Sequence, residues 1–454
     1  MDILFICVVL VTSQEPSSTH PLSHYMDVNI RILCFRKMSM PQTKEGSRLL
    51  DSTNDCKQGM SMVLLPAVLH DLSRHLKMSY TQLSIANSMA SVGAIFGSIT
   101  GGFLTKRLSN HLDLALFTVF IMITMALMSI PFTTHVVLQS LEWFVQGWAM
   151  AVGNIVNIMV VVRIWPENVG SMVLLVSAAN SVGHIAGFLL PIPFVSNDNS
   201  EKNFSPLVCV PFIILAGVFV ANAVNLLIQH AVGLRCHKCF DSVSSSDTNE
   251  RQLDPKSPSQ LLWLVVPGMG MVDIFVRASD MIPAYLAPSI GIESRLHMPA
   301  SQSDLVNAMY GISRMISKLV TSFLLKRVSV MLCLPTCIVM TSVAALFLFL
   351  IGLNSVSSFF TTMIIIGLFT GPPGALLLVW VSEYVTVDNY VVSLWQVAEN
   401  IGNLSGVLVG GVVFDIYGPL LSLFVNLIND IIACIGFFVL QCLITIRQPN
   451  SLSS

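Results

Sequence analysis

The chain has 454 residues, a net charge of −2 and only 11% charged residues, with a mean hydropathy of +0.75. A soluble domain carries about 25% charged residues, so this chain is too apolar to cover a water-facing surface of its size. The chain has no excess of basic residues that would point to a nucleic-acid partner, and the 10 scattered cysteines outline no disulfide framework. The composition predicts an all-α, polytopic membrane protein whose partner is the lipid bilayer.

The N-terminal segment, 1–58, is predicted to be irregular. It begins with the apolar run MDILFICVVLVT, which lacks a basic flank and is too short to span a bilayer. Two interpretations stay open, a weak signal-like segment and a misplaced gene start, and we favour the second.

Runs of about 20 apolar residues, the length of a membrane span, recur along the rest of the chain. Eleven full spans are predicted at 82–104, 112–131, 136–162, 170–195, 207–230, 260–289, 304–325, 328–353, 356–385, 390–414 and 418–445. A twelfth, first in order, is only the stump GMSMVLLPAVL at 59–69. At 1.5 Å per residue such a stump reaches roughly 16 Å, about half of the bilayer core.

A polar stretch rich in Ser and Asp separates the first six spans from the last six. It predicts a linker between two transmembrane halves. The expected parts are an N-terminal half at 59–230, a cytoplasmic linker at 231–259, a C-terminal half at 260–445 and a cytoplasmic tail at 446–454.

Lysine and arginine are unevenly shared between the two sets of loops. One set holds Lys106, Arg107, Arg163, Arg235, Lys238, Arg251, Lys256, Lys326, Arg327 and Arg447, and the other holds Arg74, Lys77, Lys202 and Arg295. Because cytoplasmic loops are the richer in these residues, both termini are expected to be cytoplasmic. The Asn-Phe-Ser glycosylation sequon at Asn203 falls in a loop assigned to the outside, which agrees. The sequon makes the plasma membrane the expected location.

An internal repeat marks the two halves. FLTKRLS at 103–109 follows the second span, and FLLKRVS at 323–329 follows the eighth. Both place a Lys-Arg pair, Lys106-Arg107 and Lys326-Arg327, at the same offset after Phe-Leu. Matching loops in two six-span halves are typical of parallel-repeat transporters, and we assign these pairs to cytoplasmic gating.

Small residues recur every fourth position in four spans. The stripes are Gly93, Gly97 and Gly101 in the second span, Ala179, Gly183 and Gly187 in the fifth, Ser313, Ser317 and Thr321 in the eighth, and Gly402, Gly406 and Gly410 in the eleventh. Such spacing lets helix backbones approach closely. Generic tight packing and a special role at the interface between the halves remain equal alternatives.

Charged and amide side chains lie deep inside several spans. Ionisable groups at membrane depth usually line an aqueous pathway or pair with one another. In the seventh span Asp273, Arg277 and Asp280 share one helix face, so Arg277 can pair with either acid.

Other spans add further candidates for a solute or ion pathway. They are Gln396, Glu399 and Asn403 on one face of the eleventh span, Asn154 and Asn157 in the fourth, and Arg314 in the eighth. Hydrogen bonding between helices is the competing explanation. Trp395 offers an apolar wall for a sugar ring, and Lys318 could extend toward the cytoplasm.

No catalytic or metal-binding motif is present. The chain has no Gly-rich phosphate loop, no HExxH and no nucleophile elbow, so we expect no enzyme activity. The Cys236–Cys239 cluster after the sixth span has too few ligands for zinc. No cofactor is expected apart from sodium or a proton as a coupling ion.

Several stretches resemble a known family. The layout over 59–445 is similar to the major facilitator superfamily. The stretches GMSMVLLPAVLHDL, GWAMAVGNIVNIMVVVRIW, VGHIAGFLLPIPF, GISRMIS and WQVAENIGNLSGVLVGG look like the branch of sodium-dependent glucose transporter 1 and major facilitator domain-containing protein 4, itself akin to bacterial fucose permeases. The resemblance implies that the second, fifth, eighth and eleventh helices form the interface between the halves.

The chain also departs from that family. The acid usual in the second-to-third loop is missing at Thr105-Lys106-Arg107, and Asn154 stands where an acid is usual in the fourth helix. An amide cannot take up a proton, which weakens the case for proton coupling there. The short first helix indicates a gene model that has lost an exon or a truncated, inactive isoform.

The resemblance and the buried polar residues together predict a monomeric secondary transporter. It would move a small polar solute, such as glucose, as a facilitator or a cation-coupled symporter by alternating access. The alternatives are a transporter of small organic anions and a transport-inactive relative that serves as a membrane receptor or scaffold.

Overall fold

The structure is a computed structural model. It describes residues 56–64, 68, 72, 75–78, 80–107, 112–164, 169–191, 194, 209–231 and 259–447 except 386 and 388. The expectations about residues 1–55, the sequon at Asn203, the linker at 232–258 and the tail beyond 447 lie outside the described residues.

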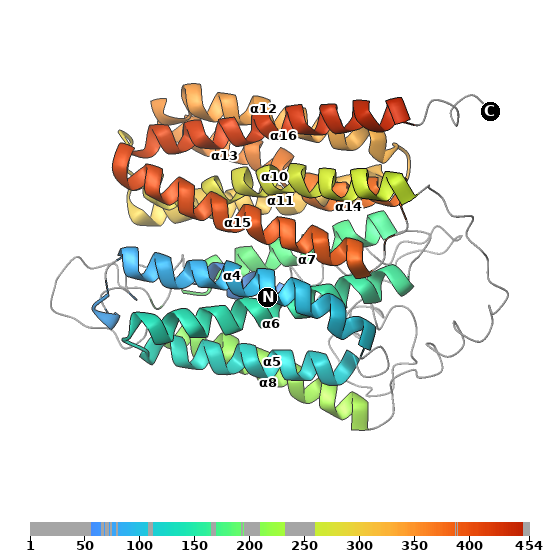
Figure 1. The fold of residues 1–454 in the computed structure, drawn as a ribbon. Helices are drawn as coiled ribbons and strands as arrows, with labels where there is room; N and C mark the ends of the chain where they lie inside the picture. The colour runs from blue at the N-terminus through green and yellow to red at the C-terminus, as the bar shows by residue number, and fades with distance from the viewer. Residues whose placement is uncertain are drawn as a thin grey trace, which may run out of the picture. The chain divides into compact units, whose positions relative to one another are not determined.

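Every regular element in the described part of the chain is a helix (Figure 1). The N-terminal half contains residues 56–64, α4 (Tyr80–Arg107), α5 (Leu112–Ser129), the 3₁₀ turn η1 (Ile130–Phe132), α6 (Val136–Ile164), α7 (Val169–Leu189) and α8 (Cys209–Ala231). The C-terminal half contains α10 (Ser259–Glu293), α11 (Ala300–Leu324), α12 (Val330–Ile351), η3 (Gly352–Asn354), α13 (Val356–Thr370), α14 (Pro373–Ser382), α15 (Asn389–Tyr417) and α16 (Pro419–Arg447). Each of the predicted full spans has its helical counterpart, with bounds that differ by a few residues.

The surface of these helices is apolar. Side chains such as Phe103, Met125 and Trp263 are each more than two-thirds exposed, at 73%, 69% and 70%. Among the described residues, nine spans are long and apolar enough to cross a membrane. Helices α6 and α11 are not among these nine. This pattern fits a multi-pass membrane protein.

The tenth predicted span is not one continuous helix. It breaks between α13 and α14 at the sequence Gly371-Pro372-Pro373. Proline has no backbone N–H, so neither Pro372 nor Pro373 can donate to a carbonyl of the preceding turn. Two successive prolines therefore end α13 and start α14.

The described residues of the first span begin before the predicted stump at 59–69, and residues 68, 72, 75 and 76 are helical as well. Residues 56–64 are helical and pack against α7, where Gly183 lies against the backbone of Cys56 and Gly187 against that of Met60. Gln146 of α6 donates a hydrogen bond to Ser61 Oγ at 2.7 Å. Residues 56–64 are thus anchored to two other helices of their half.

The small-residue stripes pack within each half and do not form the interface between the halves. The glycines of α4 face the backbone of α6, and those of α7 face residues 56–64. The stripe of α15 faces α10. Ser313 and Ser317 of α11 lie against Gly367 and Gly371 of the tenth span. Generic tight packing was therefore the correct alternative.

The same packing occurs twice, which agrees with the internal repeat in the sequence. The first span packs on the fifth and the second on the fourth, and in the other half the seventh packs on the eleventh and the eighth on the tenth. In each of these pairs the residue numbers of the contacts increase together along both helices, so the two helices run parallel.

The close approach of α15 to α10 leads to a stability prediction. A Cβ added at Gly406 would lie 2.5 Å from the carbonyl oxygen of Ala278, whereas Gly411 of the same helix has nothing within 4 Å. We expect Gly406→Ala to cost about 1–3 kcal/mol through overpacking. Gly411→Ala should be neutral or stabilising by up to about 1 kcal/mol, since alanine is the better helix former.

Thermal unfolding of the two purified variants beside the parent protein tests this expectation. The midpoint of Gly406→Ala should fall and that of Gly411→Ala should not. Equal midpoints would contradict the tight packing of α15 on α10.

Candidate functional site

Contacts between the two halves run along the helices that the resemblance implied. α7 packs on α11, and α4 packs on α15. At the end of the bundle where α7 begins and α11 ends, Ser171 Oγ donates to the carbonyl of Ser322 at 3.1 Å and Ser322 Oγ donates to the carbonyl of Ser171 at 2.9 Å. Toward the opposite end, Asn87 of α4 donates to the hydroxyl of Tyr285 of α10. The halves therefore touch on both sides of their middle.

A charged cluster lies near the middle of the bundle, on α10 and α15. Arg277 Nη2 is 3.0 Å from Glu399 Oε1, and Arg277 Nε is 3.6 Å from Asp273 Oδ1. Asp273 is fully buried, whereas the side chains of Arg277 and Glu399 keep 15% and 18% of their surface exposed. This partial exposure distinguishes the Arg277–Glu399 pair from a sealed structural ion pair.

The charged cluster continues across the interface to α6. Gln396 Nε2 donates to Glu399 Oε2 at 3.0 Å, and Asn154 Nδ2 of the N-terminal half donates to Gln396 Oε1 at 3.0 Å. Nearby, Asn400 donates to Ser98 Oγ of α4 at 3.2 Å. We call Asn154, Asp273, Arg277, Gln396 and Glu399 the central network.

Asp280 is not part of the central network, although the sequence left it as a partner of Arg277. Its Oδ2 is 2.5 Å from Arg314 Nη2, and its Oδ1 accepts a hydrogen bond from Tyr310 OH at 2.5 Å. Tyr310 also contacts Thr370 Oγ1 at 3.2 Å. Asp280 and Arg314 are only 2% and 5% exposed, so they form a buried ion pair between α10 and α11.

Lys318 does not extend toward water. It is buried, and its Nζ donates to the carbonyl of Ser177 at 3.1 Å and to Ser181 Oγ at 2.9 Å, both on α7. The ammonium group thus joins the two halves. Five residues of α7 and α11 meet in this way across the interface: Ser171, Ser177, Ser181, Lys318 and Ser322.

The other predicted residues lie apart from the central network. Asn157 is buried on α6, and the Oδ1 atom of Asn403 on α15 is buried without a hydrogen-bond partner in the described residues. Trp395 is buried in the apolar core and not placed as a wall of the network. Lys106, Arg107, Lys326 and Arg327 are exposed at the ends of α4 and α11.

Sequence reasoning missed two features of the C-terminal half. One is Tyr310, which shares Asp280 with Arg314. The other is Asp430 in α16, which accepts a hydrogen bond from Ser279 Oγ at 2.7 Å. An acid in the middle of the last span was a usable signal, because carboxylates at membrane depth are rare.

The central network offers groups that suit a polyhydroxyl ligand. Arg277 supplies N–H donors, Glu399 supplies acceptors, and the amides of Asn154 and Gln396 supply both. Two carboxylates stand against one guanidinium, so the network has no excess of positive charge. This balance favours an uncharged or cationic ligand over an organic anion.

The comparisons with known proteins agree with this architecture. Residues 57–236 match the model of the Major Facilitator Superfamily. One similar structure is the crystal structure of the major facilitator transporter FucP in its outward conformation. The alignment covers 87% of this chain and 98% of the FucP chain, with a TM-score of 0.65 and 14% identity. The chain has the major facilitator fold.

Two further structures share the fold, with similar TM-scores and sequence identities. The proton:xylose symporter XylE, bound to 6-bromo-6-deoxy-D-glucose, has a TM-score of 0.63 and 12% identity over 87% of this chain and 95% of that one. A variant of the E. coli fucose:proton symporter FucP has a TM-score of 0.63 and 13% identity over 87% and 99%. No curated protein sequence matches the chain.

Proposed function

We propose that the protein is a secondary transporter that moves a small, uncharged polar solute, most simply a sugar, across a membrane by alternating access. The observation that carries the proposal is the chain of contacts from Asn154 through Gln396 and Glu399 to Arg277, which joins both halves near the middle of α10. In major facilitator folds the solute site lies at this level, and the halves rock around it. A solute that competes for these contacts loosens one half from the other.

Two considerations support a sugar over an organic anion. The two carboxylates of the central network would repel a negative ligand, while its amides and its guanidinium pair well with hydroxyls. The similar structures include symporters of xylose and of fucose. The stretches that look like the sodium-dependent glucose transporter 1 branch point the same way.

The coupling ion follows from which groups can carry a charge. Asn154 cannot accept a proton, so proton coupling at the central network would have to use Asp273 or Glu399. Sodium coupling needs oxygen ligands and no proton acceptor. We place the protein in the plasma membrane with both termini cytoplasmic, glycosylated at Asn203.

Uptake into proteoliposomes tests the proposal. The purified chain would be reconstituted and offered radiolabelled fucose, xylose, glucose and small organic acids, under a sodium gradient, a proton gradient or neither. We expect saturable uptake of at least one sugar and none of the acids. The gradient that raises accumulation identifies the coupling ion, and equal uptake without a gradient identifies a facilitator.

Empty liposomes and a charge-reversed Arg277→Glu variant serve as controls. Saturable uptake of an acid but of no sugar would transfer the proposal to organic anions. If correctly inserted protein transports nothing in the panel yet binds a protein partner, the receptor or scaffold alternative replaces the transporter.

A further inference from the structure

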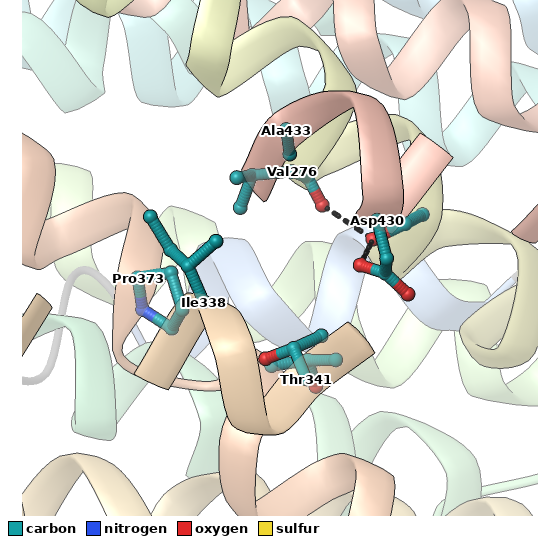
Figure 2. A pocket seen from close by; sticks show the side chains of 8 residues that line it. Val276, Ile338, Thr341, Pro373, Asp430 and Ala433 are labelled. Carbon is teal, nitrogen blue, oxygen red and sulfur yellow. Dashed lines mark hydrogen bonds between the residues drawn. The ribbon is translucent and has the colours of Figure 1, made fainter. Parts of the chain in front are cut away.

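A small cavity lies inside the C-terminal half, away from the central network. It is lined by residues of α10, α12, α16 and the break in the tenth span: Val276, Ser279, Ile338, Thr341, Thr370, Pro373, Asp430 and Ala433 (Figure 2). The space open to the centre of a water-sized particle is about 10 Å³. That is room for roughly one water molecule or one bare ion.

Asp430 leaves one carboxylate oxygen unused beside this cavity. The residue is only 3% exposed. Its Oδ1 accepts a hydrogen bond from Ser279 Oγ at 2.7 Å, while its Oδ2 is buried and has no hydrogen-bond partner. A buried carboxylate oxygen without a donor is costly. No lysine or arginine lines the cavity to neutralise it.

The other polar groups of the cavity are oxygens. Thr341 Oγ1 donates its own proton to the carbonyl of Cys337 at 2.9 Å, so its lone pairs remain available. Thr370 and Ser279, which also carry hydroxyl groups, line the space as well. Oxygen donors of this kind are the ligands that hard cations prefer.

The helix break adds a negative electrostatic potential, the same sign as that of the Asp430 carboxylate. α13 ends at Thr370, beside the cavity, and a helix C-terminus carries partial negative charge. α14 begins at Pro373, and neither Pro372 nor Pro373 has an N–H to offer. The anion-attracting donors of a normal helix N-terminus are therefore reduced here.

We propose that this cavity is a binding site for a single monovalent cation of the size of Na⁺, with Asp430 and Thr341 as ligands. One carboxylate balances one positive charge, and the hydroxyls complete the oxygen shell. The cavity has little room for a larger ion with its water.

The site is positioned to influence the interface between the halves. Thr370 lines the cavity and also contacts Tyr310 OH, which donates to Asp280 of the buried ion pair with Arg314. Ser279, on the other side of the cavity, directly precedes Asp280 in α10. Cation occupancy thus reaches α10 and α11 through two short routes.

Binding of radioactive sodium to the purified full-length protein in detergent tests the site. Ionic strength is held constant with choline, and unlabelled Na⁺, Li⁺ and K⁺ compete. We expect one saturable Na⁺ site per chain. Li⁺ should compete for this site better than K⁺ does. Asp430→Asn and Thr341→Val should each weaken Na⁺ binding at least about tenfold, a loss of roughly 1.4 kcal/mol.

Each variant has a matched control. Asp415→Asn makes the same change at an exposed carboxylate, and Thr336→Val makes it at an exposed threonine of α12 whose hydroxyl likewise donates within the helix, to Leu332. Both controls should bind Na⁺ like the parent protein. If Asp430→Asn does not fold, Thr341→Val decides the matter, because it keeps the carboxylate and nearly the same volume.

The site is overturned if the parent protein shows no saturable Na⁺ binding, or if folded Asp430→Asn or Thr341→Val binds it as tightly as the controls. This readout is independent of solute uptake. A protein that transports a sugar but binds no Na⁺ would overturn the cation site alone, and one that binds Na⁺ but transports nothing would leave the site in place.

Discussion

Replacing Glu399 with glutamine should lower solute uptake by at least about tenfold, which corresponds to roughly 1.4 kcal/mol of lost interaction. Glu399 is 3.0 Å from Arg277 Nη2 and accepts from Gln396 at 3.0 Å. The neutral amide keeps the size of the side chain but gives up the charge-assisted contact with Arg277. Arg277 would then be held mainly by the buried Asp273, away from the interface with Asn154.

The measurement is the initial rate of uptake of whichever sugar the panel identifies, together with the thermal stabilisation that this sugar gives the purified protein. Glu383→Gln is the control, because Glu383 is exposed at the end of α14. Loss of both uptake and stabilisation would place Glu399 in the solute site. Unchanged uptake in Glu399→Gln would remove the central network from the transport mechanism.

Replacing Arg314 with methionine should destabilise the fold strongly. The substitution leaves Asp280 buried with only Tyr310 as a charge-relieving donor. Breaking one side of a buried ion pair typically costs about 3–5 kcal/mol, whereas replacing both partners by neutral groups costs far less. The double variant Arg314→Met with Asp280→Asn should therefore be more stable than Arg314→Met alone.

Membrane proteins often unfold irreversibly, so the comparison is best made as half-lives of folded protein at one fixed temperature. Arg295→Met, at an exposed arginine, is the control and should match the parent protein. A double variant that is no more stable than Arg314→Met would mean that Arg314 contributes through its packing and not through Asp280.

The helical architecture could be predicted from residues alone because a bilayer restricts the chain so strongly. A segment of about 20 apolar residues has to satisfy its backbone hydrogen bonds internally, and a helix does so. The helices from α4 to α16 therefore begin and end close to the predicted spans. The exception is the tenth, where two prolines interrupt a run that is apolar throughout.

The sequence provided less information about which buried side chains pair with one another. The sequence placed Asp273, Arg277 and Asp280 on the same helix face, and that geometry is local. It did not reveal that Arg277 turns to Glu399 of α15 or that Asp280 turns to Arg314 of α11. Those pairings depend on how α10 is rotated against two neighbours, and no spacing within one helix encodes that rotation.

The small-residue stripes are a second case in which spacing within one helix did not identify the neighbouring helix. Spacing of four showed that α4, α7, α11 and α15 approach other helices closely, and those four helices do carry the contacts between the halves. The stripes themselves point the other way, into their own half. A helix at an interface has two packed faces, and a periodic stripe alone does not say which neighbour it meets.

The sequence by itself determined the membrane class, the helical spans and the twofold repeat, because each of these rests on composition and periodicity within single segments. Tertiary structure alone decided which polar residues meet: Asn154 with Gln396 across the halves, Lys318 with α7, and Asp430 with Ser279 beside a cavity. These contacts join residues more than a hundred positions apart, and they form only when packing fixes the rotation and depth of every helix.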